Sequence, residues 1–79
     1  MTIAEALSTR LTELMEEKHL TAYRLSMLTG VNQTPIADLK KKRNTAVNVR
    51  ILFVLCHGVG LELVEFFNSP IFKTENIVD

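Results

Sequence analysis

Cysteines, long apolar runs and targeting signals are all scarce in this 79-residue chain, and each scarcity excludes a class of protein. The single cysteine, Cys56, excludes an internal disulfide framework, and no cysteine or histidine cluster offers four metal ligands. The longest apolar run, Ile51 to Cys56, is far shorter than the ~20 residues that a membrane span needs. No cationic segment followed by an apolar run opens the sequence, so we expect a cytoplasmic protein.

The residue patterns of an enzyme are also missing. No glycine-rich phosphate loop is present, and Cys56 and His57 are neighbours whose side chains would point about 100° apart on a helix, which does not suit a catalytic pair. We therefore predict that the protein is not an enzyme and that it has no cofactor, metal site or small-molecule ligand.

A net charge of zero conceals a strongly uneven distribution of charge. Residues 18–50 hold seven cations and one carboxylate, Asp38, which gives this segment a net charge of +6. Residues 1–17 and residues 51–79 each hold four carboxylates and one cation, a net charge of −3. The middle of the chain is therefore the part suited to a polyanion.

A chain of this length forms one domain, and its first segment has the pattern of an amphipathic helix. Thr2 and Glu5 can form a capping box at its start. The apolar residues fall at steps of three and four, namely Ile3, Ala4, Leu7, Leu11, Leu14 and Met15.

Two short helices joined by a tight turn are predicted over residues 20–43. Thr21 is the predicted N-cap of the first of them, with Leu25 and Leu28 facing inward, and Gly30 suits the left-handed position that ends it. Asn32 caps the next helix, in whose first turn Pro35 is tolerated.

A fourth helix is predicted from about Ala46 to His57, stopped by Gly58 and Gly60. Its Val, Ile and Phe content also permits a β-strand, but a lone strand would have no partner. A short fifth helix is expected over Leu63 to Asn68, so residues 1–69 form the domain and residues 70–79 a tail that either packs through Ile71 and Phe72 or frays.

These features resemble the helix-turn-helix of the lambda-repressor-like, Cro-type DNA-binding family. The matching pattern is Leu25, Ser26, Leu28, Gly30, Val31, Ile36 and Leu39, followed by the segment Val59 to Phe67. The resemblance covers roughly residues 7 to 67. It implies an all-α fold, a compact five-helix bundle whose third helix enters the major groove of double-stranded DNA, commonly as a homodimer.

Positions carried over from the family give the expected DNA-binding residues. Gln33 and Thr34 match the start of the recognition helix, where base edges are read, and Asp38 could accept a hydrogen bond from cytosine N4. The remaining expected DNA-binding residues are Thr21, Ala22, Tyr23, Asn32, Ala37, Lys40, Lys41, Lys42, Arg43 and Asn44. Thr21 to Tyr23 would hold a phosphate at a helix N-terminus, and the cations at the end of the recognition helix would contact the DNA backbone.

The resemblance thus implies a sequence-specific, repressor-like transcriptional regulator. The alternative is an antitoxin or accessory subunit that uses the same fold to hold a protein partner. Phe53, Val54 and Val64 are apolar residues beyond those that the core needs, and we expect them to form the dimer interface. A tail folded back over the same patch is the competing explanation.

Overall fold

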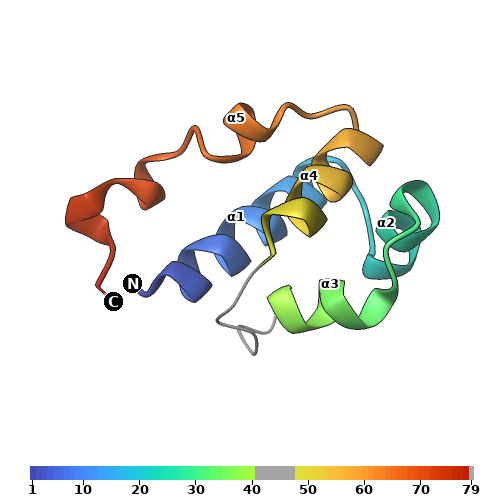
Figure 1. The fold of residues 1–79 in the computed structure, drawn as a ribbon, viewed down its shortest axis with the longest axis horizontal. Helices are drawn as coiled ribbons and strands as arrows, with labels where there is room; N and C mark the ends of the chain where they lie inside the picture. Colours follow the sequence, from blue (N-terminus) through green and yellow to red (C-terminus); the bar gives the residue numbers. More distant parts are fainter. Residues whose placement is uncertain (41–47, 79) are drawn as a thin grey trace.

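The computed structural model describes residues 1–40 and 48–78. Over these ranges the chain forms five α-helices and two short 3₁₀-helices, and no strand, so the predicted all-α, five-helix fold is confirmed (Figure 1). The elements are α1 (Ile3–Glu17), α2 (Ala22–Thr29), α3 (Gln33–Lys40), α4 (Val49–Gly58), α5 (Leu63–Phe66), η1 (Pro70–Phe72) and η2 (Thr74–Asn76).

Helix α1 is the longest element, and both of its ends have defined hydrogen bonds. The predicted capping box is present, because Thr2 Oγ1 accepts from the Glu5 amide at 3.1 Å and Glu5 Oε1 accepts from the Thr2 amide at 2.8 Å. Beyond the C-terminus His19 has a positive φ of 55°, which lets the Leu20 amide donate back to the Met15 carbonyl at 2.8 Å. The left-handed residue thus reverses the chain toward α2.

A single hydrophobic core joins the five helices. Its fully buried large side chains are Phe66 of α5 and Ile36 of α3. The other buried members are Leu7, Leu11, Leu14, Met15, Leu25, Leu39, Leu52, Leu55 and Cys56. Leu52, Leu55 and Phe66 therefore face the core, and Val59 packs against it half-buried.

The segment that could have been a strand is the helix α4, so the helix prediction is confirmed and its boundaries need correction. It begins at Val49, because the Asn48 side chain caps it by accepting from the Arg50 amide at 2.8 Å. The predicted residues Ala46 and Val47 lie outside the described residues. Gly58 is the last residue of the helix, one residue beyond the predicted end, and the chain turns at Gly60, which has a positive φ of 75°.

Helix α5 is one turn long and ends at Phe66, two residues earlier than predicted. The segment after it returns along α1, and Phe72 packs edge-on against Phe67 with ring centroids 4.9 Å apart. Near the end, the Val78 amide donates to the Met1 carbonyl at 2.8 Å. The two ends of the chain therefore lie side by side (Figure 1). Of the two expectations for the tail, packing through Phe72 is the one observed; the boundary at residue 69 stays a prediction.

Candidate nucleic-acid interface

Helices α2 and α3 form a unit joined by the turn Gly30–Val31–Asn32. Thr21 caps α2, its Oγ1 accepting from the Arg24 amide at 3.1 Å. Gly30 ends α2 in the left-handed conformation with φ 78°, and its amide donates to the Ser26 carbonyl at 2.9 Å. Both sequence signals are therefore confirmed, and the turn depends on a residue that adopts positive φ without steric cost.

Helix α3 is divided into a buried face and an exposed start. Ile36 and Leu39 are buried in the core against α1 and α2. Gln33 and Thr34, in the first turn, are exposed, while Ala37 and Asp38 are half-buried. The polar side chains expected to read bases thus lie at the accessible end of a helix that is fixed by its apolar face.

The start of α2 presents a second polar surface. Thr21 and Tyr23 are exposed, the latter to 59%, and Ala22 is half-buried because it packs against the core. The first amides of a helix have no carbonyl partner within it, and they carry the positive end of the helix dipole. This end of α2 can therefore accept an anion such as a phosphate group.

Part of the expected site cannot be placed. Lys41, Lys42, Arg43 and Asn44 lie outside the described residues. Lys40 is the last residue of α3, and Asn32 is exposed immediately before the helix begins. The structure therefore brings together the residues from Thr21 to Tyr23 and from Asn32 to Lys40 through one helix-turn-helix unit.

Two exposed cations in the first turns of helices were counted in the charge of the sequence but received no role. Arg24 lies in the first turn of α2 next to Tyr23, and Arg50 lies in the first turn of α4. Their positions relative to the helix caps could have indicated a role. Arg24 follows the cap Thr21 by three residues, and Arg50 follows the cap Asn48 by two. At such positions a cation stands beside the amides that favour an anion.

One expectation about α2 is wrong. Leu28 was predicted to face inward with Leu25, but it is 47% exposed. The inward face of α2 instead runs from the buried Leu25 to the half-buried Thr29, four residues later, and Thr29 meets α4 at Gly58. Leu28 is left on the outer side of the helix.

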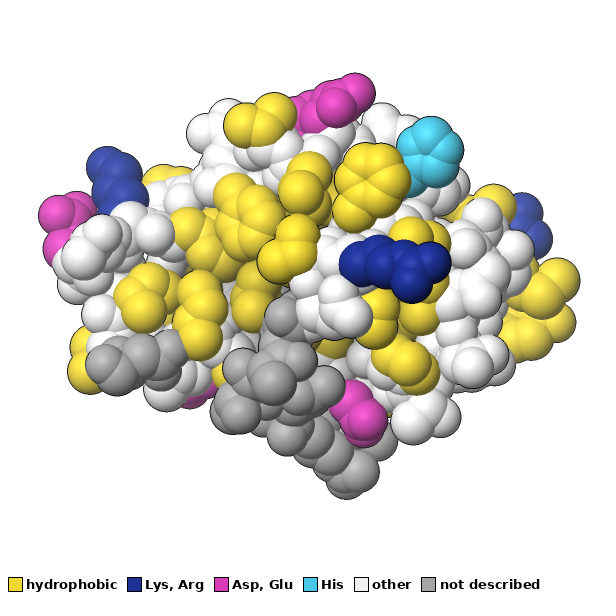
Figure 2. Space-filling model, in the orientation of Figure 1, with side chains coloured by type: hydrophobic (Ala, Val, Ile, Leu, Met, Phe, Trp, Pro, Cys, Tyr) yellow, Lys and Arg dark blue, Asp and Glu magenta, His cyan; other side chains and the backbone are white. Residues whose placement is uncertain are grey.

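Hydrophobic side chains gather over α4, α5 and the C-terminal segment on one face of the molecule (Figure 2). The three residues expected at a dimer interface belong to these two helices: Phe53 is 53% exposed, Val64 is 75% exposed, and Val54 is half-buried. The Phe53 ring stacks on His57 with centroids 5.9 Å apart. Phe53 and Val64 have this exposure with η1 and η2 in place, so the tail does not cover them.

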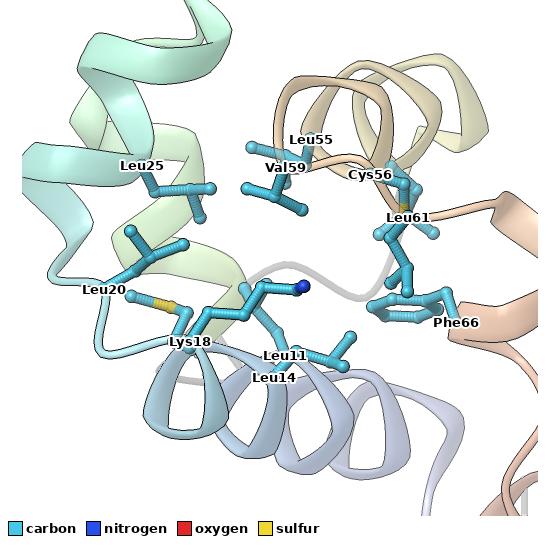
Figure 3. Close-up of a pocket in the computed structure, with 12 residues that line it drawn as sticks. Leu11, Leu14, Lys18, Leu20, Leu25, Leu55, Cys56, Val59, Leu61 and Phe66 are labelled. Carbon is cyan, nitrogen blue, oxygen red and sulfur yellow. The ribbon is translucent and has the colours of Figure 1, made fainter.

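A small recess lies inside the bundle, bounded by α1, α2, α4 and the segment around α5 (Figure 3). Its lining is apolar except for Lys18, whose side chain extends over the recess (Figure 3). The volume of about 20 Å³ is far below the roughly 300 Å³ at which ligand pockets begin. It is a gap in core packing.

The described ranges hold neither a cluster of metal ligands nor a membrane-spanning helix. Residues 1–40 and 48–78 contain no group of three or more His, Cys, Asp or Glu side chains that could hold a metal ion. No helix within the same ranges has the length and apolar character needed to cross a membrane.

The comparisons with known proteins agree with this geometry. A family described as the Cro/C1-type HTH DNA-binding domain matches residues 10–67. The chain is also similar to a solved structure described as the crystal structure of the prophage Lp1 protein 11, with 27% identity and a TM-score of 0.77 over 89% of this chain and 92% of that chain. No curated protein matches. Since the family match spans most of the chain, including α2, the turn and α3, this protein belongs to the Cro/C1-type helix-turn-helix family of DNA-binding domains.

Proposed function

We propose that this protein is a repressor-like transcriptional regulator that inserts α3 into the major groove of its operator. The observation that carries the proposal is the exposed first turn of α3, where Gln33 and Thr34 project from a helix anchored by Ile36 and Leu39. A glutamine amide can bond to N6 and N7 of adenine together, and a threonine offers a hydroxyl and a methyl group. These two side chains read base edges.

Phosphate contacts hold α3 in register on the duplex. The amides at the start of α2, the Thr21 hydroxyl and the exposed Arg24 supply one such contact. From the sequence alone, we assign a second phosphate contact to Lys40, Lys41, Lys42, Arg43 and Asn44. Asp38 accepts from a cytosine N4 donor, because a half-buried carboxylate near phosphates needs a donor to offset the repulsion.

The regulator acts as a two-fold homodimer through α4 and α5. Phe53 and Val64 are exposed apolar residues, and burying such a side chain contributes roughly 1.5–3 kcal/mol. A two-fold axis at this face places two recognition helices about one DNA turn, ~34 Å, apart on a palindromic site. The alternative function, an accessory subunit that holds a different protein, rests on the same apolar face.

Selection of bound sequences from random duplex DNA tests the proposal, followed by titration of the selected site and of random DNA over a salt series. Replacing Gln33 by Ala is expected to cost about 1–3 kcal/mol on the selected site and little on random DNA. Replacing Arg24 by Gln is expected to weaken both and to flatten the salt slope by about one unit.

Lys73→Gln is the matched control, since it removes an exposed cation between η1 and η2 and is expected to leave the salt slope unchanged. A wild type that enriches no sequence and shows no salt dependence would exclude the DNA-binding role and favour the protein-binding alternative.

A further inference from the structure

Helices α2 and α4 approach each other closely where Thr29 meets Gly58. A Cβ atom added to Gly58 would lie 2.5 Å from Thr29 Cγ2 and 3.1 Å from both Thr29 Cα and Thr29 Cβ. The first distance is shorter than real Cβ contacts allow, and the other two involve the backbone and the base of the side chain, which cannot rotate away. Only glycine at residue 58 permits α2 to lie at its observed distance from α4.

Thr29 also connects the end of α2 to the chain leading into α3. Its hydroxyl donates to the Leu25 carbonyl at 2.8 Å and accepts from the Val31 amide at 3.2 Å. Val31 lies two residues before Gln33, the first residue of α3. A shift of Thr29 is therefore passed to the start of α3 through a hydrogen bond and a short turn.

The packing of the helices makes the contact between Thr29 and Gly58 decisive for the orientation of α3. The extensive contacts of α2 are with α3 and α4, and those of α3 are with α1 and α2. The helix-turn-helix unit is thus held at two places, α3 on α1 and α2 on α4. Displacing α2 from α4 would tilt the unit about the contact between α3 and α1, because packed helices move as rigid bodies.

We propose that Gly58 is a positioning residue for base recognition: through its contact with Thr29 it sets the orientation of α3, and so the placement of Gln33 and Thr34. The inference rests on the proposed function. Gly58 lies in α4, outside the helix-turn-helix, and acts through Thr29 without meeting DNA.

Four variants test the proposal with the selected site and random duplex DNA as probes, each checked for folding by circular dichroism at the temperature of measurement. Gly58→Ala is expected to lower the ratio of specific to random affinity by about 5- to 100-fold, the equivalent of one misaligned bidentate base contact. Thr29→Ser alone is expected to bind as the wild type, since it keeps the hydroxyl.

The double variant G58A/T29S is expected to recover part of the lost ratio, because serine lacks the Cγ2 methyl group that gives the shortest contact, while the 3.1 Å contacts with Cα and Cβ remain. Gly60→Ala is the matched control. It is strained by a positive φ but meets no atom within 4 Å, so it is expected to lose stability and keep the wild-type ratio.

The ratio of specific to random affinity distinguishes a change in the orientation of α3 from a loss of stability. A variant that is only less stable loses specific and random affinity in parallel through its folded fraction, whereas a tilted α3 loses the specific part. Should Gly58→Ala fail to fold, Thr29→Val carries the test: it keeps the methyl group against Gly58 and loses the link to Val31, with an expected loss in ratio of about 2- to 10-fold.

A folded Gly58→Ala with the wild-type ratio, a double variant without recovery, or a Thr29→Val with the wild-type ratio would each overturn the inference and leave the proposed function standing. A wild type that selects no sequence would overturn both.

Discussion

The Arg10 guanidinium of α1 donates from Nε to the Phe66 carbonyl at 2.7 Å and from Nη2 to the Glu65 carbonyl at 2.8 Å. In a longer helix these carbonyls would accept from the amides of residues 69 and 70, and Pro70 has no amide hydrogen to give. Arg10 supplies a donor to the Phe66 carbonyl and adds a second donor to the Glu65 carbonyl, which also accepts from the Asn68 amide at 3.2 Å. The contact fastens the end of α5 to α1.

Replacing Arg10 by Met is expected to destabilise the fold by about 1.5–3 kcal/mol, the range for hydrogen bonds to a charged group. Methionine keeps the apolar stem and removes the donors. The measurement is urea unfolding followed by circular dichroism, with Arg24→Met, an exposed arginine, as the control. Equal midpoints for the two variants would contradict the role of Arg10.

His19 holds a conformation that costs a side-chain-bearing residue roughly 1–2 kcal/mol, with φ 55° at the end of α1. His19→Gly removes this strain, partly offset by the greater freedom of glycine in the unfolded chain, and is expected to raise the free energy of unfolding by up to about 1 kcal/mol. Thermal unfolding is the measurement. His19→Ala keeps the strain and is expected to give no gain, so a gain in both variants would point to another cause.

Cys56 is buried, and burial raises the pKa of its thiol above the ordinary value of 9.0, partly opposed by the nearby charge of Arg10. The folded protein therefore keeps this proton at a pH where the unfolded chain has lost it, so the thiol makes stability fall as pH rises through and above 9. The free energy of unfolding of the wild type is expected to fall more between pH 8 and pH 10 than that of Cys56→Ala. Identical slopes would contradict the shift.

The proposed homodimer predicts that Phe53→Glu is monomeric at concentrations where the wild type is dimeric, because a carboxylate in the interface would be buried without a partner. Sedimentation equilibrium at tens of micromolar measures it. Met27→Glu changes an exposed apolar residue of α2 and is expected to remain dimeric. A chain ending at Ser69 is also expected to dimerise; a monomeric wild type would exclude the homodimer.

The sequence determined the local features whose causes lie within a few residues. The capping box of Thr2 and Glu5, the cap of Thr21 and the left-handed Gly30 each depend on neighbours along the chain. The cap and the glycine belong to the pattern that resembles the family. The exposed start of α3 followed from the resemblance to that family. The order of the five helices could therefore be predicted.

Contacts between residues far apart in the chain were decided only by the tertiary structure. Arg10 fastens the end of α5 from 56 residues away, and Thr29 rather than Leu28 faces α4, where Gly58 leaves room. The exposure of Phe53 and Val64 likewise depends on where the tail packs. Helical periodicity fixes which side chains share a face of a helix. The packing of whole helices sets which neighbour that face meets and at what distance, and the pattern of residues along the chain does not encode either.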